Sequence, residues 1–238
     1  MRDGLILVQG AMDVETEWLT AQLEAPEETE LGEFPFWRGT CRGRELVVSQ
    51  TGVGMVRAAA ATALGIQRFA PALVVNQGIA GAHREDLHVG DIVVGRTCVP
   101  IHQVQMPPRS RGEGTAPGDW ALWDFAREAP PAPWAADPDW AARFEGAPYA
   151  GGRKVSGRLG SGDVFHQEQD RIAWLRERAG EDCEDMESGA AFQVCQSLGT
   201  PCLGLRIISN NELTGEPYRR EVGEDLQRFV LEVLTGHP

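Results

Sequence analysis

Several features that mark other classes of protein are missing from this sequence. No apolar run approaches the roughly 20 residues of a membrane-spanning helix. The first apolar run covers only residues 5–8, so we expect neither a membrane anchor nor a signal peptide. A net charge of −13 serves solubility and leaves few basic residues for phosphate contacts. We therefore expect no nucleic-acid partner and no membrane partner.

Patterns typical of disulfide, metal and dinucleotide sites are also missing. The five cysteines are odd in number and scattered, without a CxxC pair, which favours reduced thiols in a cytoplasmic protein. The five histidines lack ligand spacing, so we expect no metal and no other cofactor. Gly10-Ala11-Met12 follows the first apolar run where a Rossmann dehydrogenase would carry GxGxxG.

The sequence does contain short apolar runs that alternate with helical patterns. Near-continuous apolar strands separated by helices predict a parallel-rich sheet between helices. We expect a single α/β domain over residues 1–238, a three-layer sandwich whose central mixed, mostly parallel sheet is flanked by helices. Strands are predicted at 5–9, 45–50, 72–77, 91–95, 154–159 and 203–209, and helices at 15–23, 55–69, 167–178, 188–197 and 222–234.

Residues 99–150 interrupt this alternation. They hold nine of the 15 prolines and four of the seven tryptophans, with a brief helical pattern at 120–127. Solvated linkers lack tryptophan, so the segment is predicted to be an insertion rather than a linker. Two interpretations stay open: a lid or oligomer contact, and an insertion packed on the flank of the domain.

Polar residues follow several of the predicted strands, and loops at the carboxyl ends of parallel strands meet at one edge of the sheet. Met186 and Glu187 form a pair suited to a ribose, because a carboxylate accepts two hydroxyl hydrogens while a thioether packs on the sugar. Arg206 and Asn210, at the next strand end, could serve a water and a base. The converging loops are 10–15, 51–55, 78–82, 184–187 and 206–210.

Together these motifs resemble the nucleoside phosphorylase/nucleosidase superfamily, and most of all the methylthioadenosine/S-adenosylhomocysteine nucleosidases. The resemblance covers residues 5–95 and 154–235. It implies a nucleoside phosphorylase-like fold, a small-molecule purine nucleoside as substrate, hydrolysis of its N-ribosidic bond and a homodimer. The segments that carry it are GAMDVE at 10–15, TGVG at 51–54, NQGIAG at 76–81, VGDIV at 89–93, SGDVF at 161–165, DME at 185–187 and RIISN at 206–210.

The resemblance assigns a catalytic role to three residues. Glu15 is the base that activates water, Arg206 orients that water, and Asn210 serves the leaving base. Each has a structural alternative: Glu15 as an ordinary helix residue, Arg206 as half of an ion pair, and Asn210 as a turn residue. Phosphorolysis is the rival chemistry, but Asp13 and Glu15 would repel phosphate.

Six further residues are predicted to bind substrate. Glu187 holds the ribose hydroxyls beside Met186, although a glutamate here could also cap the next helix. Phe165 stacks on the base, unless it packs in the core, and His166 reaches the purine edge through its main chain. Ile79 and Gly81, from the central loop, complete this set; Ile79 stands where phosphorylases often carry a hydroxyl residue.

Asn210 departs from the pattern of the adenosine-type nucleosidases, which carry an aspartate that protonates the leaving adenine. An amide cannot deliver a proton at neutral pH, but its NH₂ group can donate to the oxygen of a 6-oxopurine. The favoured substrate is a 5′-substituted adenosine such as methylthioadenosine or S-adenosylhomocysteine. A futalosine- or inosine-like substrate, a phosphorylase and a nucleoside-binding protein without catalysis stay open, as does Glu212 as a replacement acid.

Overall fold

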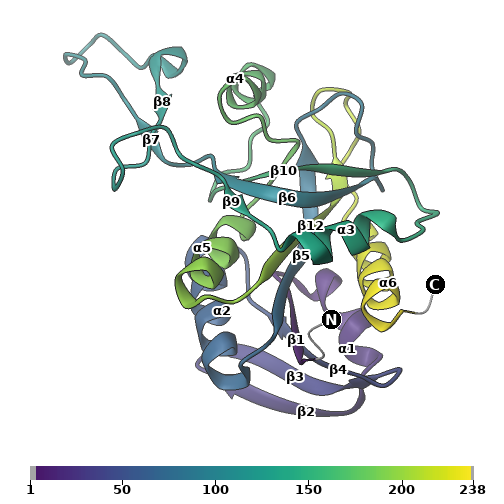
Figure 1. The fold of residues 1–238 in the computed structure, drawn as a ribbon. Helices are drawn as coiled ribbons and strands as arrows, with labels where there is room; N and C mark the ends of the chain where they lie inside the picture. Colours follow the sequence, from purple (N-terminus) through teal and green to yellow (C-terminus); the bar gives the residue numbers. More distant parts are fainter. Residues whose placement is uncertain (1–3, 237–238) are drawn as a thin grey trace.

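The computed structural model describes residues 4–236, which fold around one large sheet (Figure 1). The strands follow the spatial order β11-β10-β6-β12-β5-β1-β4-β3-β2, and β9 pairs with β6 at one side. Their bounds are β1 (Ile6–Gly10), β2 (Glu24–Leu31), β3 (Phe34–Cys41), β4 (Arg44–Gln50), β5 (Leu73–Ala82), β6 (Ile92–Pro100), β9 (Trp134–Ala135), β10 (Lys154–Ser161), β11 (Cys183–Asp185) and β12 (Cys202–Asn210).

The sheet is mixed, as predicted. β4, β1, β5 and β12 run parallel to their neighbours in this order, and β6, β10 and β11 do the same. β12 and β6 join these two groups in antiparallel fashion, and β11 also pairs antiparallel with β5. The strands from β5 to β11 therefore close on themselves, which brings the end of β5 against β11.

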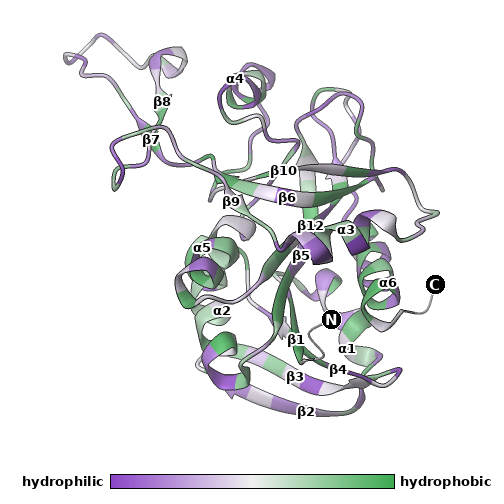
Figure 2. Ribbon diagram, viewed as in Figure 1, coloured by the Kyte–Doolittle hydropathy of each residue, from purple (hydrophilic) through white to green (hydrophobic). Residues whose placement is uncertain are grey.

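Helices cover both faces of the sheet, which confirms the three-layer architecture. α2 and α5 pack together on one face, while α1, α3 and α6 lie on the other (Figure 1). Hydrophobic residues line β1, β5 and β12 between these layers (Figure 2). The helices are α1 (Glu17–Ala21), α2 (Met55–Phe69), α3 (Pro138–Gly146), α4 (Gln169–Ala179), α5 (Ser188–Leu198) and α6 (Val222–Thr235).

The structure departs from the predicted elements in three places. β2 and β3 form an antiparallel edge that was not predicted, because most β2 side chains are exposed and the strand carries no apolar run. The helix expected at 15–23 is a 3₁₀ turn at Asp13–Glu15 followed by the short α1. The helix expected at 120–127 is instead the short strand β8 (Ala121–Leu122) followed by turns.

The insertion divides into two parts. An arm that contains β7 (Val104–Gln105), a 3₁₀ turn at Pro117–Asp119 and β8 projects from the domain (Figure 1). The following residues return to the sheet through β9, and α3 packs Ala141 and Phe144 into the core beside α6. The α3 part thus fits the flank-packing interpretation, while the arm leaves the lid and oligomer interpretations as predictions.

The structure also bears on what the sequence analysis said of membrane spans and of the cysteines. Among residues 4–236, no helix combines the length and apolar character needed to cross a bilayer. All five cysteines are buried and free of disulfide bonds.

Candidate active site

Glu15 is a buried carboxylate held by main-chain donors from two loops. Its Oε2 accepts from the amides of Ala11 (2.6 Å) and Met12 (3.0 Å), and its Oε1 accepts from the amide of Ile79 (2.8 Å). The residue is only 3% exposed. Its position is therefore fixed by the loop after β1 and by β5. This excludes the alternative interpretation of Glu15 as an ordinary helix residue that faces solvent.

Burial raises the pKa of Glu15, although the three amides and the charge of Arg206 oppose the rise. A carboxylate that is hard to ionise in place is a stronger base once ionised, which suits proton abstraction from water. The close packing also explains Gly78. A Cβ atom at that position would lie 2.5 Å from Oε1 of Glu15, so only glycine leaves room for the carboxylate.

Glu187 lies at the start of α5 and reaches the glycine loop that precedes α2. Its Oε1 accepts from the amide of Gly54 (2.8 Å). On the other side of this loop, Oδ1 of Asp163 accepts from the amide of Met55 (2.7 Å). Gly54 adopts a φ of +104°, in the region that favours glycine. The loop is thus clamped between two of the segments that the sequence placed at the site.

The carboxylates of Glu15 and Glu187 belong to one electrostatic site. Burial raises the pKa of Glu187 to about 8, and the negative charges of Asp185 and Glu15 add to the rise while Arg206 opposes it. Main-chain bonds also join the loops: the amides of Thr51 and Gly52 donate to the carbonyls of Gly10 and Ala11. The predicted convergence of loops at one sheet edge is therefore confirmed.

The raised pKa of Glu187 predicts a pH dependence of folding. Because the folded protein keeps a proton that the unfolded chain, with an ordinary pKa of 4.5, releases, stability is lost as pH rises towards 8. The contribution is at most about 1.4 kcal/mol per pH unit. We expect the free energy of unfolding of the wild type, measured in urea between pH about 5 and about 6.5, to fall more steeply than that of Glu187→Gln. Equal slopes would contradict the assignment.

Arg206 forms the ion pair that the sequence analysis left open. It is 1% exposed, and its Nε lies 3.2 Å from Oδ2 of Asp185. Its terminal nitrogens donate to the carbonyls of Asn76 (3.0 Å) and Leu205 (2.8 Å) and to Oδ1 of Asn76 (2.5 Å). The guanidinium therefore neutralises part of the acidic site from within the sheet. Its contact with a water stays a prediction.

Asp185 was not among the predicted site residues, although it belongs to the motif at 185–187. Its Oδ1 accepts from the hydroxyl of Ser161 and from the amides of Glu187 and Ser188 at 2.7–2.8 Å. It thereby fixes the first turn of α5 and the backbone of Glu187, while its other oxygen faces Arg206. Asp185 is the link between the start of α5, with Glu187, and the buried Arg206.

Asn210 ends β12 next to Gly81. Its Nδ2 donates to Oε1 of Glu212 (3.2 Å), and its Oδ1 accepts from the hydroxyl of Ser209 (2.9 Å). A Cβ atom at Gly81 would meet the Asn210 amide at 3.5 Å and Cγ of Glu184 at 3.7 Å. Asn210 thus lies at the same edge of the sheet as Glu15 and Glu187. Another acid, Glu212, accepts a hydrogen bond from its NH₂ group.

A family profile and known proteins of similar sequence and structure identify the family of this chain. The profile of the Phosphorylase superfamily matches residues 5–234. The chain belongs to this superfamily.

Within this superfamily, the similar relatives and solved structures include several nucleosidases. A 5′-methylthioadenosine/S-adenosylhomocysteine nucleosidase from Geobacillus kaustophilus is 32% identical, over 96% of this chain and 90% of the relative. The nucleosidase from Neisseria meningitidis, solved with methylthio-immucillin-A, is 28% identical with a TM-score of 0.77 over 98% of this chain and 99% of its own. The nucleosidase from Colwellia psychrerythraea, solved with adenine, is 27% identical with a TM-score of 0.78. This match covers 99% of this chain and 96% of that structure's chain.

The predicted base-side residues of this superfamily member lie between β10 and α4. Phe165 is 51% exposed, so it does not pack in the core and its ring is available for stacking. The main-chain amide of His166 donates to Oε1 of Glu184 (2.7 Å), and its Nδ1 lies 2.5 Å from Oε2 of the same residue. A purine contact through the His166 amide would therefore have to displace Glu184.

Sequence analysis missed a group of titratable residues behind this segment. Burial would lower the pKa of His83, but its interactions with the Glu181 and Glu184 carboxylates outweigh it and raise the pKa to about 9. Burial would raise the pKa of Glu184, but its interactions with His166 and His83 lower it to about 2. Spacing could not reveal these contacts, because the antiparallel pairing of β11 with β5 creates them.

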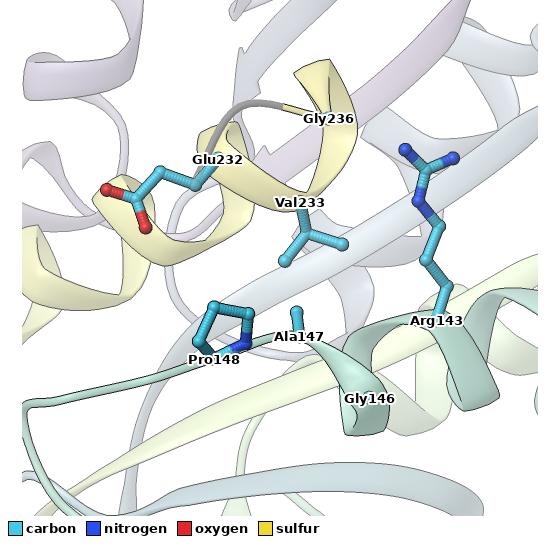
Figure 3. Close-up of a pocket in the computed structure, with 7 residues that line it drawn as sticks. All are labelled: Arg143, Gly146, Ala147, Pro148, Glu232, Val233 and Gly236. Atoms are coloured by element: carbon cyan, nitrogen blue, oxygen red, sulfur yellow. The ribbon is translucent and has the colours of Figure 1, made fainter.

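A separate cavity lies away from the carboxylates. It has a volume of about 330 Å³ between the ends of α3 and α6, and its lining includes Arg143, Pro148, Glu232 and Val233 (Figure 3). None of the predicted site residues lines it. The candidate active site is therefore the loop edge around Glu15 and Glu187, and not this cavity.

Proposed function

We propose that the protein is a purine nucleoside N-ribosyl hydrolase that releases the free base from a 5′-substituted adenosine such as methylthioadenosine or S-adenosylhomocysteine. The observation that carries the proposal is the buried carboxylate of Glu15, electrostatically coupled to Glu187 across loops from three parts of the chain. The nucleosidases named above, which are similar along nearly the whole chain, support the substrate class.

The two carboxylates have different tasks in this mechanism. Glu187 acts in its ionised form, which a pKa of about 8 makes the minor form at pH 7. In that form it accepts the ribose hydroxyls, and its charge stabilises the positive charge that develops on the sugar as the bond to the base breaks. Met186 is half-buried beside it and packs on the sugar. Glu15 takes a proton from water while the water oxygen bonds to the anomeric carbon, and the electron pair of the broken bond leaves with the base.

Hydrolysis fits this site better than phosphorolysis. Phosphate would have to approach two buried acidic groups, Glu15 and Glu187, and the negative charge of either one, once ionised, would repel it. Asp13, which the sequence analysis paired with Glu15 for this role, is exposed and pairs with Arg220 instead. Arg206 offers no simple phosphate contact, because its terminal nitrogens bond Asn76 and Leu205 within the sheet. Ile79 supplies no hydroxyl, and its amide is already bonded to Glu15.

Asn210 favours a second candidate, a 6-oxopurine nucleoside such as a futalosine- or inosine-like substrate. Its NH₂ group can donate to the base oxygen, whereas it cannot protonate adenine. In the structure this NH₂ group bonds Glu212, so Glu212 is the nearest acid that could supply a proton on the adenine route. Both substrate classes use the same sugar-binding and water-activating residues.

The decisive experiment is incubation with methylthioadenosine, S-adenosylhomocysteine, adenosine, inosine and futalosine, each with and without phosphate, followed by chromatography of the free base. Phosphate-independent release of adenine supports the proposal, and preferential release of hypoxanthine supports the second candidate. Strict phosphate dependence would show a phosphorylase. Tight nucleoside binding without base release would show a binding protein on the same fold.

Asn210→Asp tests the basis of base selection. We expect this variant to release adenine from methylthioadenosine at least tenfold faster than the wild type, because a carboxylic acid can protonate the leaving base and such acids contribute about 10²–10⁴-fold. Initial rates with methylthioadenosine and inosine measure the change. If Glu212→Gln abolishes adenine release while Asn210→Asp leaves it unchanged, Glu212 is the acid.

The assembly and location of the protein also belong to this proposal. Val56 is 80% exposed and Val53 48% exposed at the start of α2, beside the clamped glycine loop. Apolar side chains here favour a homodimer interface next to the site. Sedimentation equilibrium of the wild type and of Val56→Asp measures the association.

Buried, unpaired cysteines favour a reducing compartment such as the cytoplasm, and the substrate would place the enzyme in methionine salvage.

A further inference from the structure

His83, His166 and Glu184 form a compact cluster beside the base-side segment. Each offers one nitrogen or oxygen atom, and these atoms all lie within 4.8 Å of one another. His83 follows β5, Glu184 lies in β11, and His166 lies between β10 and α4. The amide of His83 donates to the carbonyl of Asp182 (3.0 Å), which extends the β5–β11 pairing and sets the two elements in register.

The orientation of His83 is the first argument for a ligand. Its Nδ1 lies 2.8 Å from Oε1 of Glu181, so the carboxylate fixes the ring. Its Nε2 is turned towards Oε2 of Glu184 at 3.4 Å but makes no hydrogen bond, although the residue is only 2% exposed. A carboxylate behind a histidine whose other nitrogen faces a cluster is the usual outer support of a metal-bound imidazole.

Buried charge is the second argument. Glu181 is fully buried and Glu184 is 4% exposed, and buried carboxylates are costly unless a cation or donors compensate them. The nearby arginines are engaged elsewhere, because Nη1 atoms of Arg84 and Arg176 both bond Oδ1 of Asp182. The proton that His83 keeps on its ring compensates only part of this charge. A divalent cation between two neutral imidazoles would replace that proton and balance the two negative charges.

Access is the third argument. His83 lines an open cavity of about 750 Å³, which also touches Arg84, Ile172 and Arg176. Of the three cluster residues, only His83 lines this cavity, while His166 lies on a segment whose neighbour Phe165 is exposed. The cavity is therefore the side from which an ion would approach His83.

We propose that Nε2 of His83, Nδ1 of His166 and the Glu184 carboxylate bind a divalent transition metal of the zinc type. Imidazole and carboxylate donors suit zinc, cobalt or nickel better than magnesium or calcium, which take oxygen ligands. Ligands about 2.0–2.1 Å from a tetrahedral ion lie about 3.3–3.4 Å apart. The His83–Glu184 separation of 3.4 Å already matches, and the His166–Glu184 contact must lengthen.

Three protein ligands leave a position on the metal for water or another small ligand. The site lies across Gly81 from Asn210, since Cγ of Glu184 is 3.7 Å from a Cβ built on Gly81. It uses neither Glu15 nor Glu187, but it shares His166 with the predicted base-side residues, to which His166 contributes its main chain. The sequence predicted no metal, since the two histidines are far apart in the chain.

Titration of chelator-treated protein with Co²⁺ and Zn²⁺ tests the site. We expect one Co²⁺ per chain, with visible d–d absorption of the intensity of a four- or five-coordinate site, and displacement by Zn²⁺. His166→Ala and Glu184→Gln should weaken binding at least 100-fold, and Glu181→Gln should weaken it about 10–100-fold as a supporting residue. His166 lies on a surface segment, so its variant should keep the wild-type circular dichroism and melting temperature without metal.

His88→Ala is the matched control, because exposed His88 also pairs with a carboxylate, Glu216, at 2.5 Å. It should bind Co²⁺ as the wild type does. Absence of stoichiometric binding, or equal binding by the wild type and His166→Ala, would overturn the proposal and identify the cluster as a hydrogen-bonded histidine–glutamate network only. The readout is metal binding by the protein without nucleoside, so it is distinguishable from nucleoside hydrolysis, which the substrate assay measures separately.

Discussion

Glu15→Gln is expected to lower kcat for base release by about 10²–10⁴-fold, the usual contribution of a general base. The amide keeps the size of the carboxylate but cannot take a proton from water. It also turns either an oxygen or an NH₂ group towards the amides of Ala11, Met12 and Ile79, which donate to both carboxylate oxygens. KM for methylthioadenosine should change much less than kcat, because Glu187 still holds the sugar.

Asp13→Asn is the control for this variant. Asp13 belongs to the same loop, but its side chain is exposed and pairs with Arg220. Its kcat should stay within about twofold of the wild type, since exposed ion pairs contribute little. Steady-state rates, with circular dichroism to verify folding, measure both variants. Wild-type turnover by folded Glu15→Gln would remove Glu15 from the mechanism.

Arg206→Met is expected to lower the free energy of unfolding by about 3–5 kcal/mol, the cost of removing one partner of a buried ion pair. The change leaves Asp185 buried without its cation and removes the donors to Asn76 and Leu205. It also removes the positive charge that lowers the pKa of both Glu15 and Glu187. Urea unfolding at a fixed pH measures the loss.

The double variant Asp185→Asn/Arg206→Met separates charge from packing. If the cost arises from an unpaired charge, the double variant should be more stable than Arg206→Met alone. Strictly additive losses would instead assign the effect to lost packing. Arg38→Met, which removes an exposed ion pair with Glu45, should change stability by less than about 1 kcal/mol.

The fold was predictable where single segments bury continuous apolar surface. β1, β5 and β12 read as strands because each is buried on both faces, and α2 and α6 show helical periodicity with well-defined ends. The edge strand β2 escaped prediction because its exposed residues carry no hydrophobic pattern. The residues of the arm escaped it because proline and short turns leave no periodicity to detect.

The site was predictable in part because its residues lie directly after strands. Glu15 and Glu187 follow β1 and β11 closely, and parallel strands carry their ends to one edge. Arg206 was predicted at a strand end but lies within β12, four residues before its end. What could not be predicted was which oxygen bonds which amide, such as Gly54 with Glu187. The ion pair of Arg206 with Asp185 was one of two open interpretations, and the sequence alone does not show that the two side chains are in contact.

By itself, the sequence determined the α/β class, the superfamily and the residues that meet at the loop edge, because local hydrophobic periodicity and short motifs encode them. Only the tertiary structure decided the burial of Glu15, the shared field of Glu15, Glu187 and Arg206, and the meeting of His83 with His166. The physical reason is that desolvation and Coulomb interactions depend on distance and burial in space, and the closure of the sheet from β5 to β11 sets both.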